Sequence, residues 1–171
     1  MEPISLKVID DGNREAVCAL SVADRQRSFV AENAKTLTQA SEAPEAWLRA
    51  IYAGDQLVGL VLLHDEHLRE EPREEGYYFL WRLMVAEPFQ GKGYGRKAID
   101  LVVDYVRTRP HAKRLLSSHL PGDEGPAGFY RRCGFRETGK TDHGEVEIEL
   151  VLVGAPEEGR GAADNRGGSE G

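Results

Sequence analysis

Apolar and polar positions alternate near the start of the chain and predict a β-strand over residues 4–9. Every second residue there is apolar, which is the period of a strand with one buried face. Residues 13–22 and 24–36 follow, with helix-capping residues before them and few apolar positions. They are predicted to be two helices on the surface of a sheet.

The middle of the chain predicts three more strands. Residues 46–53 and 56–64 are apolar runs joined at Gly54-Asp55, and this pair suits a tight hairpin turn. Residues 65–76 are rich in charge and contain proline, so they are predicted to be a solvated loop. Residues 77–85 contain a single charged side chain and have the strongest strand pattern in the chain.

The clearest helix is predicted at residues 96–107, directly after a glycine-rich turn at 88–95. Its apolar residues recur at helical spacing and form one broad face that packs on a sheet. Pro110 disfavours helix at the residue before it and ends the element. The remaining elements are a strand, a short helix and an antiparallel strand pair, at 114–120, 126–133, 135–140 and 145–153.

This order of elements predicts one α+β (mixed α/β) domain over residues 1–153. Strands and helices do not alternate regularly, as they would in a doubly wound fold. The chain has 171 residues, 40% of them hydrophobic, which is ordinary for a domain with its own core. Residues 154–171 lack large apolar side chains, are rich in glycine and hold four acidic against two basic residues. They are predicted to be a disordered acidic tail.

The net charge of −7 disfavours nucleic acid as a partner, because phosphate binding needs a basic surface. The electrostatic field of an acidic protein attracts cations, so this charge mildly favours a cationic substrate. No run of about 18 apolar residues occurs, so no membrane span is predicted. The first residues lack the layout of a signal peptide, so a cytoplasmic protein is expected, in which Cys18 and Cys133 stay free thiols.

A glycine-rich segment between the strongest strand and the clearest helix carries the candidate chemistry. Alternate glycines let a backbone approach a ligand closely. The unpaired amides and the positive dipole end of a helix N-terminus favour a phosphate group. Three cationic side chains in the segment add to this preference. The predicted anion site consists of Gln90, Gly91, Lys92, Gly93, Tyr94, Gly95, Arg96 and Lys97.

Other interpretations of this segment fit less well. A Walker-type loop needs Ser or Thr after Gly-Lys, and no residue of the segment is Ser or Thr. A dinucleotide-binding fingerprint starting at Gly91 and Gly93 needs Gly or Ala where Arg96 stands. A tight turn without a ligand explains neither the three glycines nor the three cations.

Two motifs resemble the GCN5-related N-acetyltransferase (GNAT) superfamily. The segment Gln90-x-x-Gly93-x-Gly95, after Met84-Val85, is similar to its pyrophosphate-binding motif. The segment from Phe129 to Phe135 is similar to its aromatic-Tyr-x-x-x-Gly-Phe motif. The element order is also similar over residues 4–153. The resemblance implies a mostly antiparallel sheet that splays between its fourth and fifth strands, is flanked by helices, and admits acetyl-CoA.

The resemblance also implies roles for individual residues. The backbone of Met84 and Val85 would pair with the pantetheine arm, while the amides of the glycine-rich segment hold the pyrophosphate. An amide near Val85 would stabilise the oxyanion. Tyr130 is the position that matches the family's general acid, and a phenol is well suited to protonating a thiolate leaving group. Asp123 stands where many relatives have an Asn that contacts the cofactor.

The acceptor is predicted to be a primary amine of a small molecule. Residues 29–33 and 77–85 resemble bacterial diamine or polyamine acetyltransferases within the superfamily. A polyamine needs carboxylates for its ammonium groups and aromatic faces for its methylenes. Glu32, Trp81 and Asp123 are the candidate substrate-binding residues.

Several alternatives stay open at this stage. An antibiotic or protein amino group is the alternative acceptor. From other classes, a dinucleotide-binding oxidoreductase and a non-catalytic CoA-binding protein are also considered. The general base is left open between His119, Glu32 and a chain of waters. A homodimer is compatible with the resemblance, but no apolar stripe demands it. His64 and His67 have no evident third ligand, so no metal site is predicted.

Overall fold

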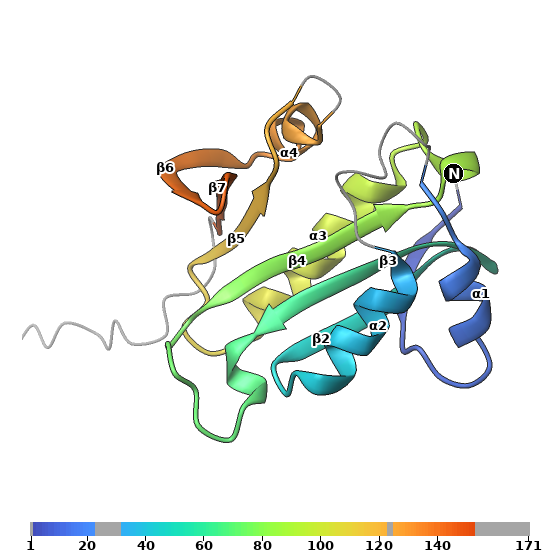
Figure 1. Cartoon of the computed structure of the whole chain (residues 1–171), viewed down its shortest axis with the longest axis horizontal. Helices are drawn as coiled ribbons and strands as arrows, with labels where there is room; N and C mark the ends of the chain where they lie inside the picture. The colour runs from blue at the N-terminus through green and yellow to red at the C-terminus, as the bar shows by residue number, and fades with distance from the viewer. Residues whose placement is uncertain (1, 23–31, 123–124, 153–171) are drawn as a thin grey trace, which may run out of the picture.

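A seven-stranded sheet organises the computed structural model, which describes residues 2–22, 32–122 and 125–152 (Figure 1). The strand order is β1-β2-β3-β4-β5-β7-β6, and every neighbouring pair except β4 and β5 is antiparallel. This confirms the predicted α+β class. The strands are β1 (Ile4–Lys7), β2 (Ala46–Ala53), β3 (Gln56–Asp65), β4 (Tyr78–Val85), β5 (Arg114–His119), β6 (Arg136–Asp142) and β7 (Glu145–Val151).

Helices cover both faces of the sheet (Figure 1). Leu60, on one face of β3, packs with the residues of α1, whereas its neighbour Val61 faces the residues of α3. This alternation follows from the period of two in a strand and explains why β3 is apolar on both faces. The helices are α1 (Arg14–Ala19), α2 (Asn33–Glu42), α3 (Tyr94–Arg107) and α4 (Ala127–Arg132), with short 3-10 turns η2 (Glu66–Leu68) and η3 (Glu87–Phe89).

The second helix extends beyond its predicted end. It was expected over 24–36, but α2 runs from Asn33 to Glu42, and residues 23–31 lie outside the described part. Two of its buried positions are polar: Asn33 donates a hydrogen bond to Val17 O at 2.7 Å, and Thr36 donates to Glu32 O at 3.3 Å. Backbone carbonyls satisfy the hydrogen-bonding needs of these two buried polar side chains. The helix can therefore pack against the sheet without the periodic apolar residues from which a helix is predicted.

Strands β4 and β5 pair over a very short distance. Their parallel register consists of Phe79 opposite Leu116 and Leu80 opposite Ser117. Beyond these residues the two strands diverge, with α4 lying past the end of β5 (Figure 1). The predicted splay between the fourth and fifth strands is therefore confirmed.

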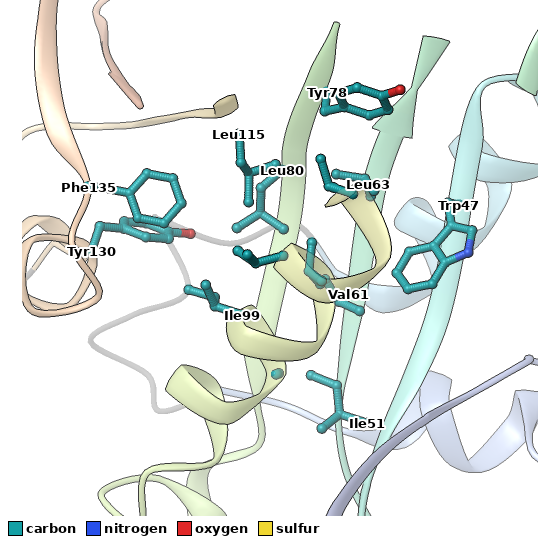
Figure 2. Packing of buried hydrophobic residues seen from close by; sticks show 14 of the residues in the cluster. Trp47, Ile51, Val61, Leu63, Tyr78, Leu80, Ile99, Leu115, Tyr130 and Phe135 are labelled. Carbon is teal, nitrogen blue, oxygen red and sulfur yellow. The ribbon is translucent and has the colours of Figure 1, made fainter. Parts of the chain in front are cut away.

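The main core lies between the sheet and α3, and it extends across the splay to α4. Leu80 from β4, Leu115 from β5 and Ile99 from α3 are each at most 2% exposed. Figure 2 shows Tyr130 and Phe135 packing beside these side chains. Aromatic residues of α4 and the segment after it thus hold the diverging strand β5 to the rest of the fold.

A buried carboxylate anchors the end of α3 to β3. Asp65 is fully buried and accepts hydrogen bonds from Tyr105 Oη at 2.6 Å and Arg109 Nε at 2.7 Å. Its other oxygen accepts from His67 N at 3.0 Å. Because the carboxylate is satisfied on both oxygens, it is tolerated in the interior.

Replacing Asp65 by alanine should therefore lower the free energy of unfolding by about 3–5 kcal/mol, the usual effect of breaking a buried ion pair. The Arg109 guanidinium and the Tyr105 hydroxyl would lose their acceptor. Urea denaturation measures the change. Asp104→Ala, on the exposed side of α3, is the matched control and should stay within about 0.5 kcal/mol of the wild type.

Candidate active site

A cleft of about 1210 Å³ opens where β4 and β5 diverge. One wall runs along β4, and the opposite wall consists of β5, α4 and the β6–β7 hairpin. The glycine-rich turn and the start of α3 close one end. Elements from both halves of the chain therefore contribute to a single concave surface.

The start of α3 presents open backbone to this cleft. Gly93 caps the helix in the left-handed conformation with φ of 82°, and Gly91 has φ of 76°. A Cβ atom at either glycine would meet nothing within 4 Å, so their backbones face open space. The first amides of α3 have no partner within the helix, and a phosphate at this end would accept their hydrogen bonds.

The predicted cofactor residues are mostly brought together here. Helix α3 begins at Tyr94, two residues before the predicted start, because Gly93 supplies the cap. The side chains of Lys92 and Lys97 do not belong to the described lining of the cleft. The predicted residues that line it are Met84, Val85, Gln90, Gly91, Gly93, Tyr94, Gly95 and Arg96.

The end of β4 presents a backbone donor to the gap. Ala86 N donates a hydrogen bond to Val58 O of the neighbouring strand β3 at 2.8 Å. Successive amides of a strand point to opposite edges, so the N–H of Val85 points into the gap. On that same side, Gln90 Nε2 donates to Val85 O at 2.8 Å and closes the turn. An amide at this position suits both pairing with an extended arm and stabilising an oxyanion.

Helix α4 passes close to the start of α3. A Cβ at Gly95 would lie 3.1 Å from Phe129 Cζ, so only glycine fits between the two helices without a shift. Gly95→Ala places a methyl group at this contact on the wall of the cleft. We expect the dissociation constant of CoA, measured by calorimetry, to rise about tenfold.

The stability of the free protein should change much less in this variant, since alanine is favoured over glycine in a helix by about 1 kcal/mol. An unchanged CoA affinity would contradict the placement of the cofactor at Gly95. Asp104→Ala on the same helix is again the control, because this exposed residue does not line the cleft.

Tyr130 lies on α4 at the inner end of the cleft and is 8% exposed. Its ring lies 5.4 Å from that of Phe135 and 6.3 Å from that of His119. Burial raises the pKa of Tyr130 to about 12, an effect only partly offset by a hydrogen bond with Ser117 and by the charge of Arg82. The phenol therefore keeps its proton at neutral pH and can donate it.

Aromatic side chains follow one wall of the cleft at the start of β4. Tyr77, Phe79 and Trp81 all line it, and the first two rings stack with centroids 6.2 Å apart. Trp81 has no partner in the pairing of β3 with β4, because Arg82 pairs with Leu62 and Leu80 pairs with the next residue of β3, Leu63. Such a β-bulge redirects side chains and is common beside active sites.

Carboxylates line the opposite wall, and sequence reasoning missed them. Glu145 and Glu147 are half-buried on β7 and accept hydrogen bonds from Ser118 Oγ at 3.2 Å and Thr138 Oγ1 at 2.9 Å. The charge of Glu147 helps raise the pKa of Tyr77, after burial and Glu74. The alternation of acidic and apolar residues over 145–149 was the available signal.

Arg82 also lines the cleft and was not predicted. Its guanidinium donates to Trp81 O at 2.8 Å. Burial lowers its pKa, while the charge of Glu145 and then Tyr130 counteract this. Arg82 thus adds positive charge to the β4 wall of the cleft.

The structure places the other predicted residues less centrally. Glu32 is exposed, precedes α2 and is absent from the described lining of the cleft, whereas Asp123 lies outside the described residues. His119 does line the cleft, with Nδ1 at 3.1 Å from Leu120 O. His64 Nε2 lies 2.6 Å from Glu66 Oε2, and His67 Nε2 accepts from Gly76 N at 2.9 Å. Cys18 and Cys133 are free thiols, as expected.

Known proteins are similar to this chain in sequence and in fold. A profile of the acetyltransferase (GNAT) family matches residues 12–135. The spermine/spermidine N(1)-acetyltransferase of Bacillus subtilis (strain 168) is 28% identical over 141 residues, which are 81% of this chain and 91% of that protein.

Solved structures agree on the fold. An acetyltransferase of Bacillus subtilis in complex with CoA has a TM-score of 0.60 at 17% identity, covering 90% of this chain and 100% of that one. The spermidine N-acetyltransferase of Vibrio cholerae, in complex with CoA and spermine, has a TM-score of 0.61 at 17% identity, covering 86% of this chain and 95% of that one.

The chain belongs to the acetyltransferase (GNAT) family, whose profile spans more than half of its length. Within that class it is an acyl-CoA-dependent N-acetyltransferase that uses acetyl-CoA, as the two sequence motifs predicted. This membership rules out the oxidoreductase interpretation of the glycine-rich turn. The open amides of α3 and the inward N–H of Val85 fit an acyl-CoA arm with a diphosphate. Among the described helices, none is both long and apolar enough to cross a membrane.

Proposed function

We propose that this protein transfers an acetyl group from acetyl-CoA to a primary amine of a small polycationic molecule, a polyamine. The observation that carries the proposal is the pairing of two unlike walls in one cleft. Tyr77, Phe79 and Trp81 form an aromatic wall, and Glu145 and Glu147 form an acidic wall across the gap.

This arrangement matches the chemistry of a polyamine. Aromatic faces attract ammonium groups and pack against the methylenes between them. Carboxylates form charge-assisted hydrogen bonds with ammonium groups, which strengthen as the cleft excludes water. The relative from Bacillus subtilis, a spermine/spermidine N(1)-acetyltransferase, supports the same acceptor class.

In this proposal, different residues of the cleft bind the coenzyme and assist the reaction. The backbone at Met84 and Val85 holds the arm of the coenzyme, and the amides from Gly91 to Arg96 hold its diphosphate. Acetyl-CoA supplies the acetyl group and the thiolate leaving group. Tyr130 donates a proton to that thiolate, and the N–H of Val85 stabilises negative charge on the carbonyl oxygen.

A thiol-release screen tests the proposal. The protein is incubated with acetyl-CoA and one acceptor at a time: spermine, spermidine, short diamines, aminoglycosides or peptides with free amino termini. The CoA thiol that is released is measured with a chromogenic thiol reagent. We expect kcat/KM to be highest with the polyamines. Negligible and equal rates on all polyamines would overturn the acceptor class, and a preference for aminoglycosides or peptides would replace it with the acceptor found. The cytoplasmic location stays a prediction, and a homodimer stays one of the arrangements compatible with the family resemblance.

A further inference from the structure

We infer that Gly59 on β3 is a positioning residue for the backbone donor at the end of β4. The absence of a side chain at Gly59 leaves room for the Met84 carbonyl and so aims the N–H of Val85 into the gap. The inference rests on the proposed function, in which this N–H stabilises the oxyanion. Gly59 is buried and is absent from the described lining of the cleft, so it acts through its neighbour and not by touching the coenzyme.

The space around Gly59 is the first step of the argument. Its partners in the sheet are Ile51 on β2 and Val85 on β4. A Cβ atom here would overlap with the Met84 carbonyl oxygen and would lie 3.2 Å from Met84 C and 3.3 Å from Ile51 Cδ1. Gly59 is not among the glycines with positive φ, so the requirement is for space and not for backbone conformation. Because the overlap is with backbone and Ile51 is fully buried, the backbone of β4 would have to shift.

The Met84 carbonyl and the Val85 N–H belong to one peptide unit. A trans peptide is planar, so its C=O and N–H point in opposite directions and turn together. The carbonyl oxygen lies on the β3 side, beside Gly59, and the N–H therefore points to the other side, into the gap. A side chain at position 59 that pushes the carbonyl away would rotate this N–H with it.

Both ends of this peptide unit are anchored. In the next unit, Ala86 N donates to a carbonyl of β3 at 2.8 Å, and Val85 O accepts from Gln90 Nε2 at 2.8 Å. The Met84 side chain is 4% exposed, and its sulfur lies 3.6 Å from Asn33 Nδ2. These contacts hold β4 against sliding as a whole. The overlap is therefore relieved by rotation of the peptide about the line between its two Cα atoms.

The direction of the Val85 N–H affects the reaction more than it affects the binding of CoA. When the amine attacks, the carbonyl oxygen of acetyl-CoA gains negative charge, which a donor already in position stabilises. A misplacement of about 1 Å in such a group can cost about 10²-fold in rate. CoA has no acetyl carbonyl, so its affinity does not depend on this interaction.

Gly59→Ala tests the inference by separating turnover from coenzyme binding. We expect kcat to fall about 10²-fold, whereas the dissociation constant of CoA, measured by calorimetry, should change little. Val61→Ala is the control on the same strand: Val61 is fully buried and pairs with Leu83, so its truncation destabilises the core without touching the Met84 carbonyl. It should lower the free energy of unfolding in urea and leave kcat unchanged.

A spectroscopic measurement reports on the donor without any acceptor amine. Acetyl-CoA labelled with ¹³C at the acetyl carbonyl is bound to the protein, and the stretching band of that carbonyl is recorded by infrared difference spectroscopy. A hydrogen bond weakens the C=O bond and lowers the frequency. The band should therefore lie at higher frequency in Gly59→Ala than in the wild type, and Val61→Ala should leave it in place.

A second background keeps the test usable if Gly59→Ala alone does not fold. Ile51→Val removes Cδ1, the side-chain atom nearest to the new methyl group. Gly59→Ala in this background should show both changes in the same direction and at smaller size. A folded Gly59→Ala protein, in either background, with wild-type kcat or an unshifted carbonyl band would overturn the inference. Absence of thiol release by the wild type with every amine would instead overturn the proposed function, since the band shift needs no acceptor.

Discussion

Replacing Tyr130 by phenylalanine should lower kcat about 10²-fold or more, the usual scale for losing a general acid. The ring and its contacts with Phe135 are kept, so the loss isolates the phenolic proton. Affinity for CoA should change little, because the proton is needed when the thiolate leaves and not when the coenzyme binds. Steady-state thiol release and calorimetry measure the two quantities.

The pH dependence of this step follows from the raised pKa. Burial raises the pKa of Tyr130 to about 12, above the ordinary value of a phenol, so the acid form persists as pH rises. Between about pH 7 and 10, Tyr130 should cause no alkaline decline in kcat. The corresponding stability contribution is complete below about pH 10 and is lost as pH rises toward 12, because the unfolded chain ionises first.

Tyr52→Phe is the matched control for Tyr130→Phe. It removes another phenolic hydroxyl, which lies on β2 and accepts a hydrogen bond from Asn13 at 3.3 Å. Turnover should be unaffected in this variant. If Tyr130→Phe also turned over at the wild-type rate, Tyr130 would have no part in the chemistry.

Removing the negative charge of the acidic wall should have the second large effect. Glu145→Gln together with Glu147→Gln should raise the KM for spermine or spermidine about 10²-fold, roughly tenfold for each charge-assisted hydrogen bond lost. Glutamine keeps the shape and an acceptor for the hydroxyls of Ser118 and Thr138. The KM for acetyl-CoA should stay the same, because the coenzyme lies along β4 and α3 in the proposed arrangement.

Glu149→Gln provides a control on the same strand. Glu149 accepts hydrogen bonds from Arg114 at 2.9 Å and from Arg136 at 3.2 Å, so its charge is already matched within β5, β6 and β7. Its replacement should lower stability slightly and leave the KM for polyamines unchanged. A similar change in KM for a simple monoamine and for spermine in the Glu145/Glu147 variant would argue against recognition of a second ammonium group.

Local patterns were sufficient where a function depends on neighbouring residues. The glycine-rich turn, the start of α3 and the Tyr130 segment were each identified from spacing and resemblance, and the structure brings them to one cleft. Backbone amides at Gly93 and the helix end are properties of a continuous stretch of chain. The sequence needs no distant partner to specify them.

Positions that depend on long-range pairing were not predicted. Asn33 is buried at the start of α2, where its side chain donates a hydrogen bond to the carbonyl of Val17, 16 residues earlier in the chain. Glu145 and Glu147 alternate with apolar residues, which predicts a half-buried strand but does not say what the exposed face meets. Conversely, Glu32 was selected for its charge and lies exposed before α2.

The sequence alone determined the α+β class, the position of the glycine-rich turn before α3 and the candidate phenol, because each follows from local hydrogen-bonding needs, periodicity or a short motif. Only the tertiary structure decided that the aromatic wall of β4 and the acidic wall of β7 line one cleft. This depends on β5 lying parallel to β4 for two register pairs and then diverging, with β7 inserted next to β5. Such an arrangement is set by packing between residues far apart in the chain, which no local pattern records.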